Sequence, residues 1–220
     1  MRIGIVSDIH GNAVGLSCAL ELMGDVDELW CAGDIVEEYR FSNEAVSILR
    51  DRDARCVLGN HDIGLLGPHG ERARSADHVD TGLVAWLAAR PLTIDTTVNG
   101  QRLIMTHASP CPPHNQYVMP HSPELRRIGE VAADVVIIGH THRQMMQRVG
   151  RPLVINPGSA GQARDPRNGR QLSYAVLTVT ADDVDVSIHD FTVEGVAVED
   201  VTVETHQRTT PDLAGAGGTS

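Results

Sequence analysis

Aromatic side chains are scarce in this sequence, which has two Trp, three Tyr and two Phe among its 220 residues. Proteins that bind single-stranded nucleic acid without sequence preference stack its bases on exposed rings, and this chain has few rings for that purpose. Basic charge is also short, because 18 Lys and Arg stand against 29 Asp and Glu, for a formal net charge of −11. We therefore expect no non-specific binding to nucleic acid or to anionic membrane surfaces.

Long apolar runs and paired cysteine motifs are missing as well. A transmembrane helix needs about 18 or more consecutive apolar residues, and the sequence has no such run. The N-terminal segment leads straight into a charged motif and lacks the apolar stretch and cleavage site of a signal peptide. The four cysteines are widely spaced and form no Cys-x-x-Cys pair: Cys18, Cys31, Cys56 and Cys111. These features predict reduced thiols, no membrane partner and a cytoplasmic location.

The first part of the chain alternates between strand and helix patterns. Short runs of β-branched or apolar residues predict strands at 2–7, 28–32, 55–58 and 135–138, of the kind that is covered on both faces. Helical periodicity predicts helices at 12–23, 42–50 and 81–90, with Asn12 as the first N-cap. The stretch 64–80 has no clear period, and we predict a long loop there with room for one short helix. Loops of this length are often functional lids.

The second part is rich in predicted strands. Asn99-Gly100 predicts a tight turn between strands at 92–98 and 102–106, because both residues tolerate positive φ angles. Further hairpins are predicted at 145–156 and 173–191, with a last strand at 196–204. We expect one α/β domain over residues 1–205, followed by a disordered tail at 206–220. Two stacked sheets, each covered on its outer face by helices, would bury these apolar runs.

Residues of metal-ligand type follow five of the predicted strands. In chain order these are Asp8 and His10, then Asp34, then Asn60, then His107, and last His140 and His142. Alone, Asp34 would fit a helix N-cap and His107 an ordinary buried histidine. Because the carboxyl ends of strands in open α/β sheets gather their ligands in one place, we expect the whole set to converge.

Mixed carboxylate, imidazole and amide ligands suit Mn²⁺, Fe, Zn²⁺ or Ni²⁺, and the lack of a Cys in the set argues against a structural zinc site. Two such cations about 3.5–4 Å apart can share a carboxylate and a hydroxide, and can hold both the attacking and the leaving oxygen of an in-line displacement. The pattern therefore predicts a two-metal phosphoesterase.

Together with the segments 7–12 (Ser-Asp-Ile-His-Gly-Asn) and 156–159 (Asn-Pro-Gly-Ser), this series resembles the calcineurin-like metallophosphoesterase superfamily, in particular its small, single-domain bacterial and archaeal phosphodiesterases. The resemblance spans about residues 1–191. It implies a four-layer α/β/β/α sandwich and two metal ions, with Mn²⁺ favoured over Fe, Ni or Zn. The ligands that it implies are, for the first metal, Asp8, His10 and His142; for both metals, Asp34; and for the second metal, Asn60, His107 and His140.

The resemblance also implies that His61 protonates the leaving group or stabilises the transition state. His61 and the bridging Asp34 are therefore the predicted catalytic residues. Many small relatives have Gly or Asn three residues after the bridging Asp, where this chain has Glu37. Larger phosphatases of the superfamily carry an acid there that orients the catalytic histidine. Both Glu37 and Asp62 are candidates for orienting His61, and a solvated surface position for Glu37 stays open.

Substrate contacts are predicted for Asn60 and His61, and for Arg72 and Arg74 in the expected lid, which are candidates for binding phosphate oxygens. An ordinary solvated loop is the alternative for the two arginines. The segment 109–122 is a candidate wall of the pocket, and Arg164 is interpreted as a structural pairing residue.

The favoured function is hydrolysis of a small phosphodiester or phosphomonoester by a hydroxide bound between two metals, with the diester preferred. A protein Ser/Thr phosphatase is the first alternative, but the pattern Gly-Asp-x-x-Asp-Arg-Gly is absent around Arg40. A catalytically silent scaffold on the same fold is the second, and the complete set of ligand positions with His61 counts against it. The substrate, the native metal and the oligomeric state stay open.

Overall fold

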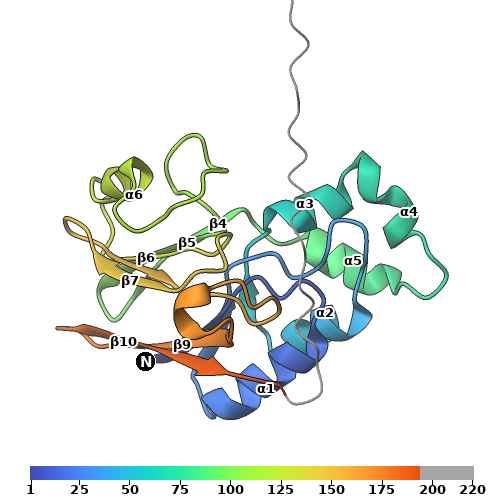
Figure 1. The fold of residues 1–220 in the computed structure, drawn as a ribbon, viewed down its shortest axis with the longest axis horizontal. Coiled ribbons are helices and arrows are strands. Elements are labelled where there is room, and N and C mark those ends of the chain that lie inside the picture. The colour runs from blue at the N-terminus through green and yellow to red at the C-terminus, as the bar shows by residue number, and fades with distance from the viewer. Residues whose placement is uncertain (194–220) are drawn as a thin grey trace, which may run out of the picture.

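Residues 1–193 are described by a computed structural model, in which two five-stranded sheets stack with helices on their outer faces (Figure 1). The first sheet has the strand order β10-β9-β1-β2-β3, and the second has the order β4-β5-β6-β8-β7. In Figure 1, α6 lies over the second sheet and α1 lies on the far side of the first. The predicted layered α/β sandwich is therefore confirmed.

Helices and strands alternate in the first part of the chain, and strands dominate the second part. In chain order the elements are β1 (Arg2–Val6), α1 (Ala13–Met23), β2 (Glu28–Cys31), α2 (Asn43–Asp51), β3 (Arg55–Cys56), α3 (Asn60–Leu66), α4 (Glu71–Arg74), α5 (Thr81–Ala88), β4 (Thr93–Val98), β5 (Gln101–Thr106), α6 (Pro123–Ile128), β6 (Val135–Ile137), β7 (Met145–Arg148), β8 (Leu153–Asn156), β9 (Leu172–Val179) and β10 (Val184–Phe191), with short 3₁₀ turns at Pro68–Gly70 and Pro166–Asn168.

The central strands of both sheets run parallel within their sheet. β1, β2 and β3 are parallel to one another, and so are β5, β6 and β8. The loops after these strands meet across the two sheets, since the backbone N–H of His140 donates to the Asp8 carboxylate and that of Gly139 donates to the His107 carbonyl. The topology thus collects the carboxyl ends of six strands along one edge of the sandwich.

Three apolar layers hold the sandwich together. Fully buried side chains such as Ile5, Trp30 and Met105 fill the space between the two sheets. A second cluster, with Leu16 and Leu49, lies under α1, α2 and α5 on the outer face of the first sheet. A third cluster lies under α6 on the second sheet. The layers explain why central strands such as β1, β6 and β8 are apolar on both faces.

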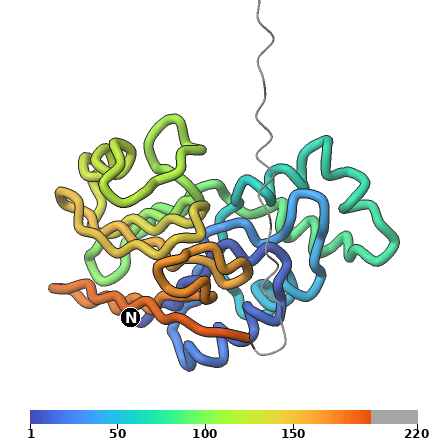
Figure 2. Tube along the Cα trace, in the orientation of Figure 1, coloured from blue at the N-terminus to red at the C-terminus, as the bar shows by residue number. Residues whose placement is uncertain are grey.

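Local sequence signals account for most of the elements. The Asn12 side chain accepts a hydrogen bond from the Gly15 N–H at 2.8 Å, so the predicted cap of α1 is confirmed. Asn99 and Gly100 have φ angles of 48° and 85°, which make the tight β4–β5 turn that was predicted. The N-terminus lies beside the β9–β10 hairpin in Figure 2, because β9 pairs with β1.

The structure corrects part of the predicted loop at 64–80, where the one short helix that was allowed for is α4. Helix α3 already covers the start of this stretch, and a 3₁₀ turn and α4 follow. The cause lies in the ligand motif itself, because the Asp62 carboxylate accepts the Gly59 N–H at 2.8 Å and so starts a helix at the end of β3. Helix α6 was not predicted either, although Ser122 caps it and Pro123 occupies its first turn.

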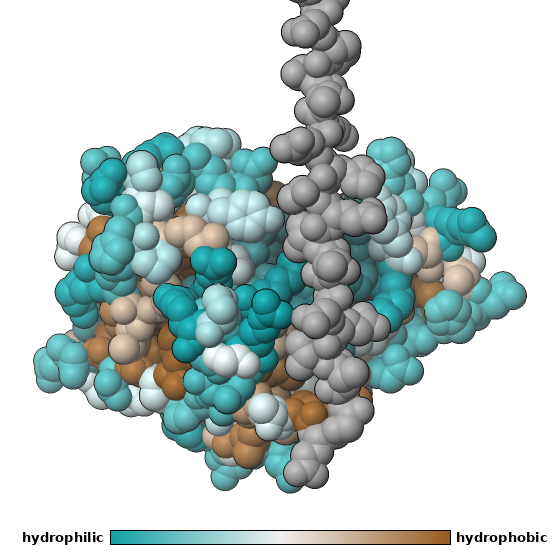
Figure 3. Space-filling view, viewed as in Figure 1, coloured by the Kyte–Doolittle hydropathy of each residue, from teal (hydrophilic) through white to brown (hydrophobic). Residues whose placement is uncertain are grey.

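The strand predicted at 196–204, the domain limit at 205 and the tail at 206–220 fall outside the described residues. Within the described part of the chain, no helix has the length and apolar character that crossing a bilayer requires. The face of the molecule shown in Figure 3 is largely hydrophilic, with smaller apolar patches between the polar residues.

Candidate metal centre

All seven predicted ligands come together at the edge where the parallel strands end. Ligand atoms lie within 4.8 Å of one another in three overlapping groups, which are Asp8, His10 and His142; His10, Asp34 and His61; and Asp34, His107 and His140. Asn60 joins them through its Oδ1, which is 3.1 Å from His107 Nε2. The loops after β1, β2, β3, β5 and β6 therefore contribute to one cluster, which we call the His/Asp cluster.

The backbone at the His/Asp cluster adopts a conformation that L-residues rarely take. Five of its members have positive φ angles: Asp8 at 52°, His10 at 50°, Asp34 at 52°, His140 at 68° and His142 at 54°. Positive φ in a residue other than glycine costs free energy, and such residues concentrate at functional sites. The five strained residues are all of metal-ligand type and all lie in the His/Asp cluster, which supports a functional site there.

Backbone carbonyls fix the orientation of two imidazole rings in the cluster. The Nδ1 of His107 lies 2.7 Å from the carbonyl of Ala32, and the Nδ1 of His142 lies 3.2 Å from that of Gln162. A hydrogen bond from Nδ1–H leaves the Nε2 lone pair free to bind a metal, as is usual for metal-ligating histidines. Both Nε2 atoms face carboxylates: His107 lies 3.2 Å from Asp34 Oδ2 and His142 lies 3.3 Å from Asp8 Oδ1.

The donor atoms fit cations better than they fit one another. The Nε2 atoms of His10 and His142 are only 3.0 Å apart, and each ring can direct a lone pair into the space between them. The Nε2 of His140 is buried and has no hydrogen-bond partner among the described residues. A buried polar atom without a partner is costly, and bound cations would satisfy these nitrogens and the facing carboxylates together.

The charge states of His140, His142 and Asp34 also suit metal binding. Burial, followed by the charge of His10, lowers the pKa of His142 to about 2, and burial and the charge of His107 lower the pKa of His140 to about 4. Burial raises the pKa of Asp34, but the hydrogen bond and charge of His107 outweigh it and hold that pKa well below its usual range. Two neutral imidazoles and an ionised carboxylate are the forms in which these groups bind metals.

Of the two acids considered for His61, Glu37 is the one that faces it. Its Oε2 lies 3.5 Å from His61 Nδ1, while its Oε1 lies 3.4 Å from His10 Nδ1. Gln162 Nε2 donates to the same carboxylate at 2.6 Å and fixes its position. Glu37 thus lies between a predicted metal ligand and the predicted proton donor, instead of being solvated at the surface.

Asp62 has a different role, because it is fully buried behind the cluster. Its two carboxylate oxygens accept the backbone N–H groups of Ile35, Val36 and Gly59 at 2.8–3.0 Å. These bonds join the loop after β2 to the start of α3, so Asp62 supports the backbone that carries Asp34 and His61. The His61 N–H in turn donates to Asp34 Oδ1 at 2.9 Å.

The arginines are placed differently from the sequence-based interpretation. Arg74 Nη1 donates to the carbonyls of Leu65 and Gly67, both at 2.6 Å, which closes the end of α3. Arg72 is exposed on α4 and makes no hydrogen bond or ion pair with any described residue. No contact joins either side chain to the described part of the His/Asp cluster, so the geometry gives no support to their predicted substrate role.

Arg164 has a different setting from the one expected of it from the sequence. We expected it to be a structural pairing residue, but its exposed side chain has no hydrogen bond or ion pair within residues 1–193. It follows Gln162 by two residues, and its charge contributes to lowering the pKa of His142. Its place five residues after Ser159 of the Asn-Pro-Gly-Ser turn was the available signal, because that turn returns to the cluster through the Ser159 hydroxyl, which donates to the Asp8 carbonyl at 2.7 Å.

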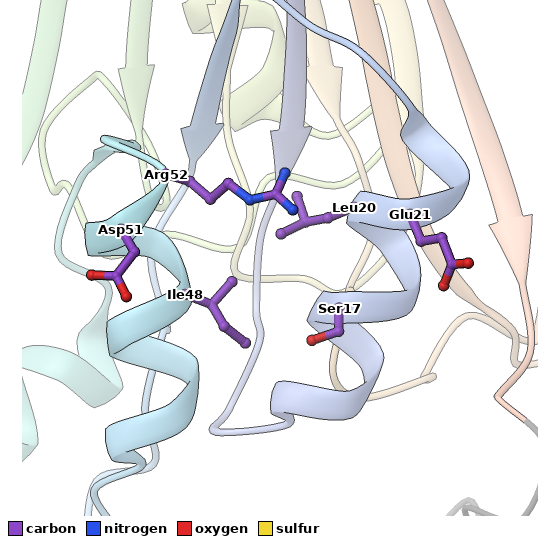
Figure 4. A pocket seen from close by; sticks show the side chains of 6 residues that line it. All are labelled: Ser17, Leu20, Glu21, Ile48, Asp51 and Arg52. Atoms are coloured by element: carbon purple, nitrogen blue, oxygen red, sulfur yellow. The ribbon is translucent and has the colours of Figure 1, made fainter.

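A separate groove lies between the C-terminal halves of α1 and α2 (Figure 4). Its volume is about 410 Å³, and it is lined by Ser17, Leu20, Glu21, Ile48, Asp51 and Arg52. It contains none of the predicted ligands, and α1 points its other end toward the His/Asp cluster. The chemistry suggested by the sequence therefore belongs to the cluster and not to this groove.

Comparisons with known proteins agree with the geometry. The family model of the calcineurin-like phosphoesterase superfamily domain matches residues 1–182. An uncharacterized protein of Methanocaldococcus jannaschii is 29% identical over 209 residues, covering 80% of this chain and 82% of that protein. The crystal structure of a metallophosphoesterase from Sphaerobacter thermophilus matches with a TM-score of 0.69 at 27% identity, covering 88% of this chain and 89% of that one.

A shorter match connects the chain to a named enzyme. The symmetrical bis(5'-nucleosyl)-tetraphosphatase of Shewanella frigidimarina is 33% identical over 137 residues, which cover 54% of this chain and 48% of the enzyme. The match thus spans about half the length of that relative.

Proposed function

The chain belongs to the calcineurin-like phosphoesterase superfamily and is a hydrolase of phosphoric esters, and on this premise we propose that it hydrolyses a small phosphodiester or phosphomonoester with two metal ions. One observation carries the proposal: five strand ends bring carboxylate, imidazole and amide donors within reach of one another, with the imidazole nitrogens directed at the carboxylates. A diester is the favoured substrate. Mn²⁺ is the favoured metal, with Fe, Ni and Zn as alternatives.

The residues divide between two cation positions. Asp8, His10 and His142 would hold one cation, Asn60, His107 and His140 would hold the other, and Asp34 would join the two. When bound, the pair of cations would supply positive charge to the phosphoryl oxygens and lower the pKa of a coordinated water. Around them, the carbonyls of Ala32 and Gln162 keep the His107 and His142 rings in the orientation that ligation needs.

His61 and Glu37 act on the leaving group. The ring of His61 stands edge-on to His10 with centroids 4.7 Å apart, so it lies in the cluster beside a proposed ligand without taking its place. A protonated His61 can donate to the departing oxygen, and the Glu37 carboxylate, 3.5 Å from Nδ1, orients the ring. We propose that Glu37 positions His61, and that Asp62 only supports the backbone between them.

The proposed function is tested by removing and restoring metal. Purified protein dialysed against EDTA is expected to lose hydrolysis of bis(4-nitrophenyl) phosphate, and added Mn²⁺ is expected to restore it, because the donor set needs cations to activate water. The same protein would then be assayed on a diester, a monoester, cyclic nucleotides and dinucleoside tetraphosphates, the last because a relative is named for them. Full activity after exhaustive chelation would contradict the two-metal proposal.

Arg164 is expected to bind the phosphate of the substrate. A hydrogen bond to a charged group contributes about 1.5–3 kcal/mol, so Arg164→Ala should lower kcat/KM by about 10- to 150-fold, mainly through KM. Arg72→Ala is the matched control, since Arg72 is also exposed and unpaired among the described residues but lies on α4. Equal losses in the two variants, measured by steady-state kinetics, would contradict the assignment, and a loss in Arg72→Ala alone would favour the lid predicted from the sequence.

A further inference from the structure

Tyr117 is one of two aromatic side chains exposed to solvent within the described residues. Seven large apolar side chains are exposed in that part of the chain, and the aromatic ones are Tyr39, with 66% of its surface accessible, and Tyr117, with 59%. The ring of Tyr117 stacks on the ring of His140, with centroids 4.0 Å apart and 20° between the planes. A chain with few aromatic residues thus exposes one of them against a predicted metal ligand.

The loop that carries Tyr117 is held in place on both sides of it. Val118 is 1% exposed and packs into the apolar cluster under α6. Before Tyr117, Arg127 Nη2 donates to the Pro112 carbonyl at 2.6 Å, and His114 Nδ1 lies 3.1 Å from the Ser109 carbonyl. Because its neighbours are anchored, the ring is presented at the cluster by the fold and does not depend on a freely moving loop.

Shielding of His140 alone does not account for the exposure of Tyr117. A ring that serves only to pack against a ligand is expected to be mostly buried, since burial is what makes apolar surface stabilising. Here one face of the ring covers His140 while most of the side chain remains accessible. The remaining surface is a flat aromatic face next to the place where a phosphoryl group would bind.

We propose that Tyr117 is a substrate-contacting residue that stacks on the base of a nucleoside phosphoester. This inference rests on the proposed phosphoesterase function and adds the substrate class. A base on the outer face of Tyr117 would form the third layer of a stack that begins with His140. It would therefore lie two ring spacings from a metal ligand, a gap that the sugar of a nucleotide can bridge between its base and its phosphate. Tyrosine suits this contact, because every base has a π-face and the ring has little conformational entropy to lose.

The test compares two ligands that differ only in the base. 5'-AMP and ribose 5-phosphate would each be titrated into the Mn²⁺-loaded protein by isothermal titration calorimetry. Stacking of one base on an aromatic residue is expected to make the wild type bind AMP about 5- to 150-fold more tightly than ribose 5-phosphate. Tyr117→Leu should bring the ratio of the AMP affinity to the ribose 5-phosphate affinity close to one. It should leave the affinity for ribose 5-phosphate and the metal content unchanged.

Two further variants separate stacking on the ring from a role of the hydroxyl and from a general effect of exposed apolar surface. Tyr117→Phe keeps the ring and should keep the ratio, and Leu22→Ala is the matched control at an equally exposed apolar position, 56% accessible, at the far end of α1. Loss of the ratio in Tyr117→Phe would assign the effect to the hydroxyl and overturn stacking. If Tyr117→Leu lowered the affinity for AMP and for ribose 5-phosphate equally, Tyr117 would only support His140, and the stacking proposal would be overturned.

Failure of this inference is distinguishable from failure of the proposed function. Metal-dependent hydrolysis of bis(4-nitrophenyl) phosphate by the wild type is measured in parallel. If that hydrolysis is present while AMP and ribose 5-phosphate bind equally, or while AMP does not bind, only the role of Tyr117 is overturned. If the hydrolysis is absent with every metal, the phosphoesterase proposal itself is overturned.

Discussion

His61→Ala is expected to keep both metals and to lose turnover by about 10²–10⁴-fold, the range that general acid catalysis typically contributes. His61 is in the cluster, but the ion-pair contact of its ring is with Glu37, and the proposed ligands around Asp34 do not include it. The loss should be greatest for an alkyl diester, whose poor leaving group needs a proton. It should be smaller for 4-nitrophenyl esters, whose leaving group departs as a stable anion.

Metal content by mass spectrometry and turnover on both kinds of ester measure these two effects separately. Loss of metal from His61→Ala would make it a ligand, and full activity on the alkyl diester would exclude it as the proton donor. Glu37→Gln then tests positioning: if Glu37 acts through His61, the substitution should reduce turnover in the wild type but have little further effect in His61→Ala. Because Glu37 also lies 3.4 Å from His10 Nδ1, metal content is measured for this variant as well.

The layered fold and the convergence of the ligands could be predicted because both follow from short-range patterns. Apolar strands that are covered on both faces must be interior strands, and residues placed after several such strands must meet at one edge. The turn at Asn99-Gly100 and the cap at Asn12 are local chemistry that the sequence states directly. Each of these features depends on a few neighbouring residues.

Features that depend on distant partners could not be read in the same way. Glu37 looks like a surface acid until the fold places His10, His61 and Gln162 around it. Asp62 adjoins His61 in sequence, yet its carboxylate turns to backbone N–H groups from the loop after β2.

The same limit applies to the charged and aromatic residues at the rim of the cluster. Arg74 seemed available for phosphate until two carbonyls at the end of α3 were seen to occupy it. For Tyr117, the direction of the ring follows from how its loop is anchored, by the buried Val118 on one side and by the contacts of Pro112 and His114 on the other. Neither placement follows from periodicity, because Arg74 reaches back to the end of α3 and the Tyr117 loop is anchored by its own irregular contacts.

Asp34→Asn is expected to remove metal from the protein and with it all measurable turnover. Asp34 lies in two of the three ligand groups, and its Oδ2 is 3.2 Å from His107 Nε2 and 3.8 Å from His10 Nε2. The amide has nearly the same shape but no charge, so two cations would lose the anion between them. Loss of an outer-shell partner costs about 10- to 100-fold in metal affinity, and loss of the shared ligand should cost more.

Thermal unfolding gives a readout of this loss that does not depend on turnover. A ligand that binds only the native state stabilises it by about 2.7 kcal/mol at a concentration of 100 times Kd, so Mn²⁺ should raise the Tm of the wild type. The Tm of Asp34→Asn should not respond to Mn²⁺, while that of Asp95→Asn, an exposed carboxylate paired with Arg102 on the β4–β5 hairpin, should respond like the wild type. Two tightly bound metals in Asp34→Asn would show that Asp34 does not join the two cations, and the division of ligands between two positions would have to be redrawn.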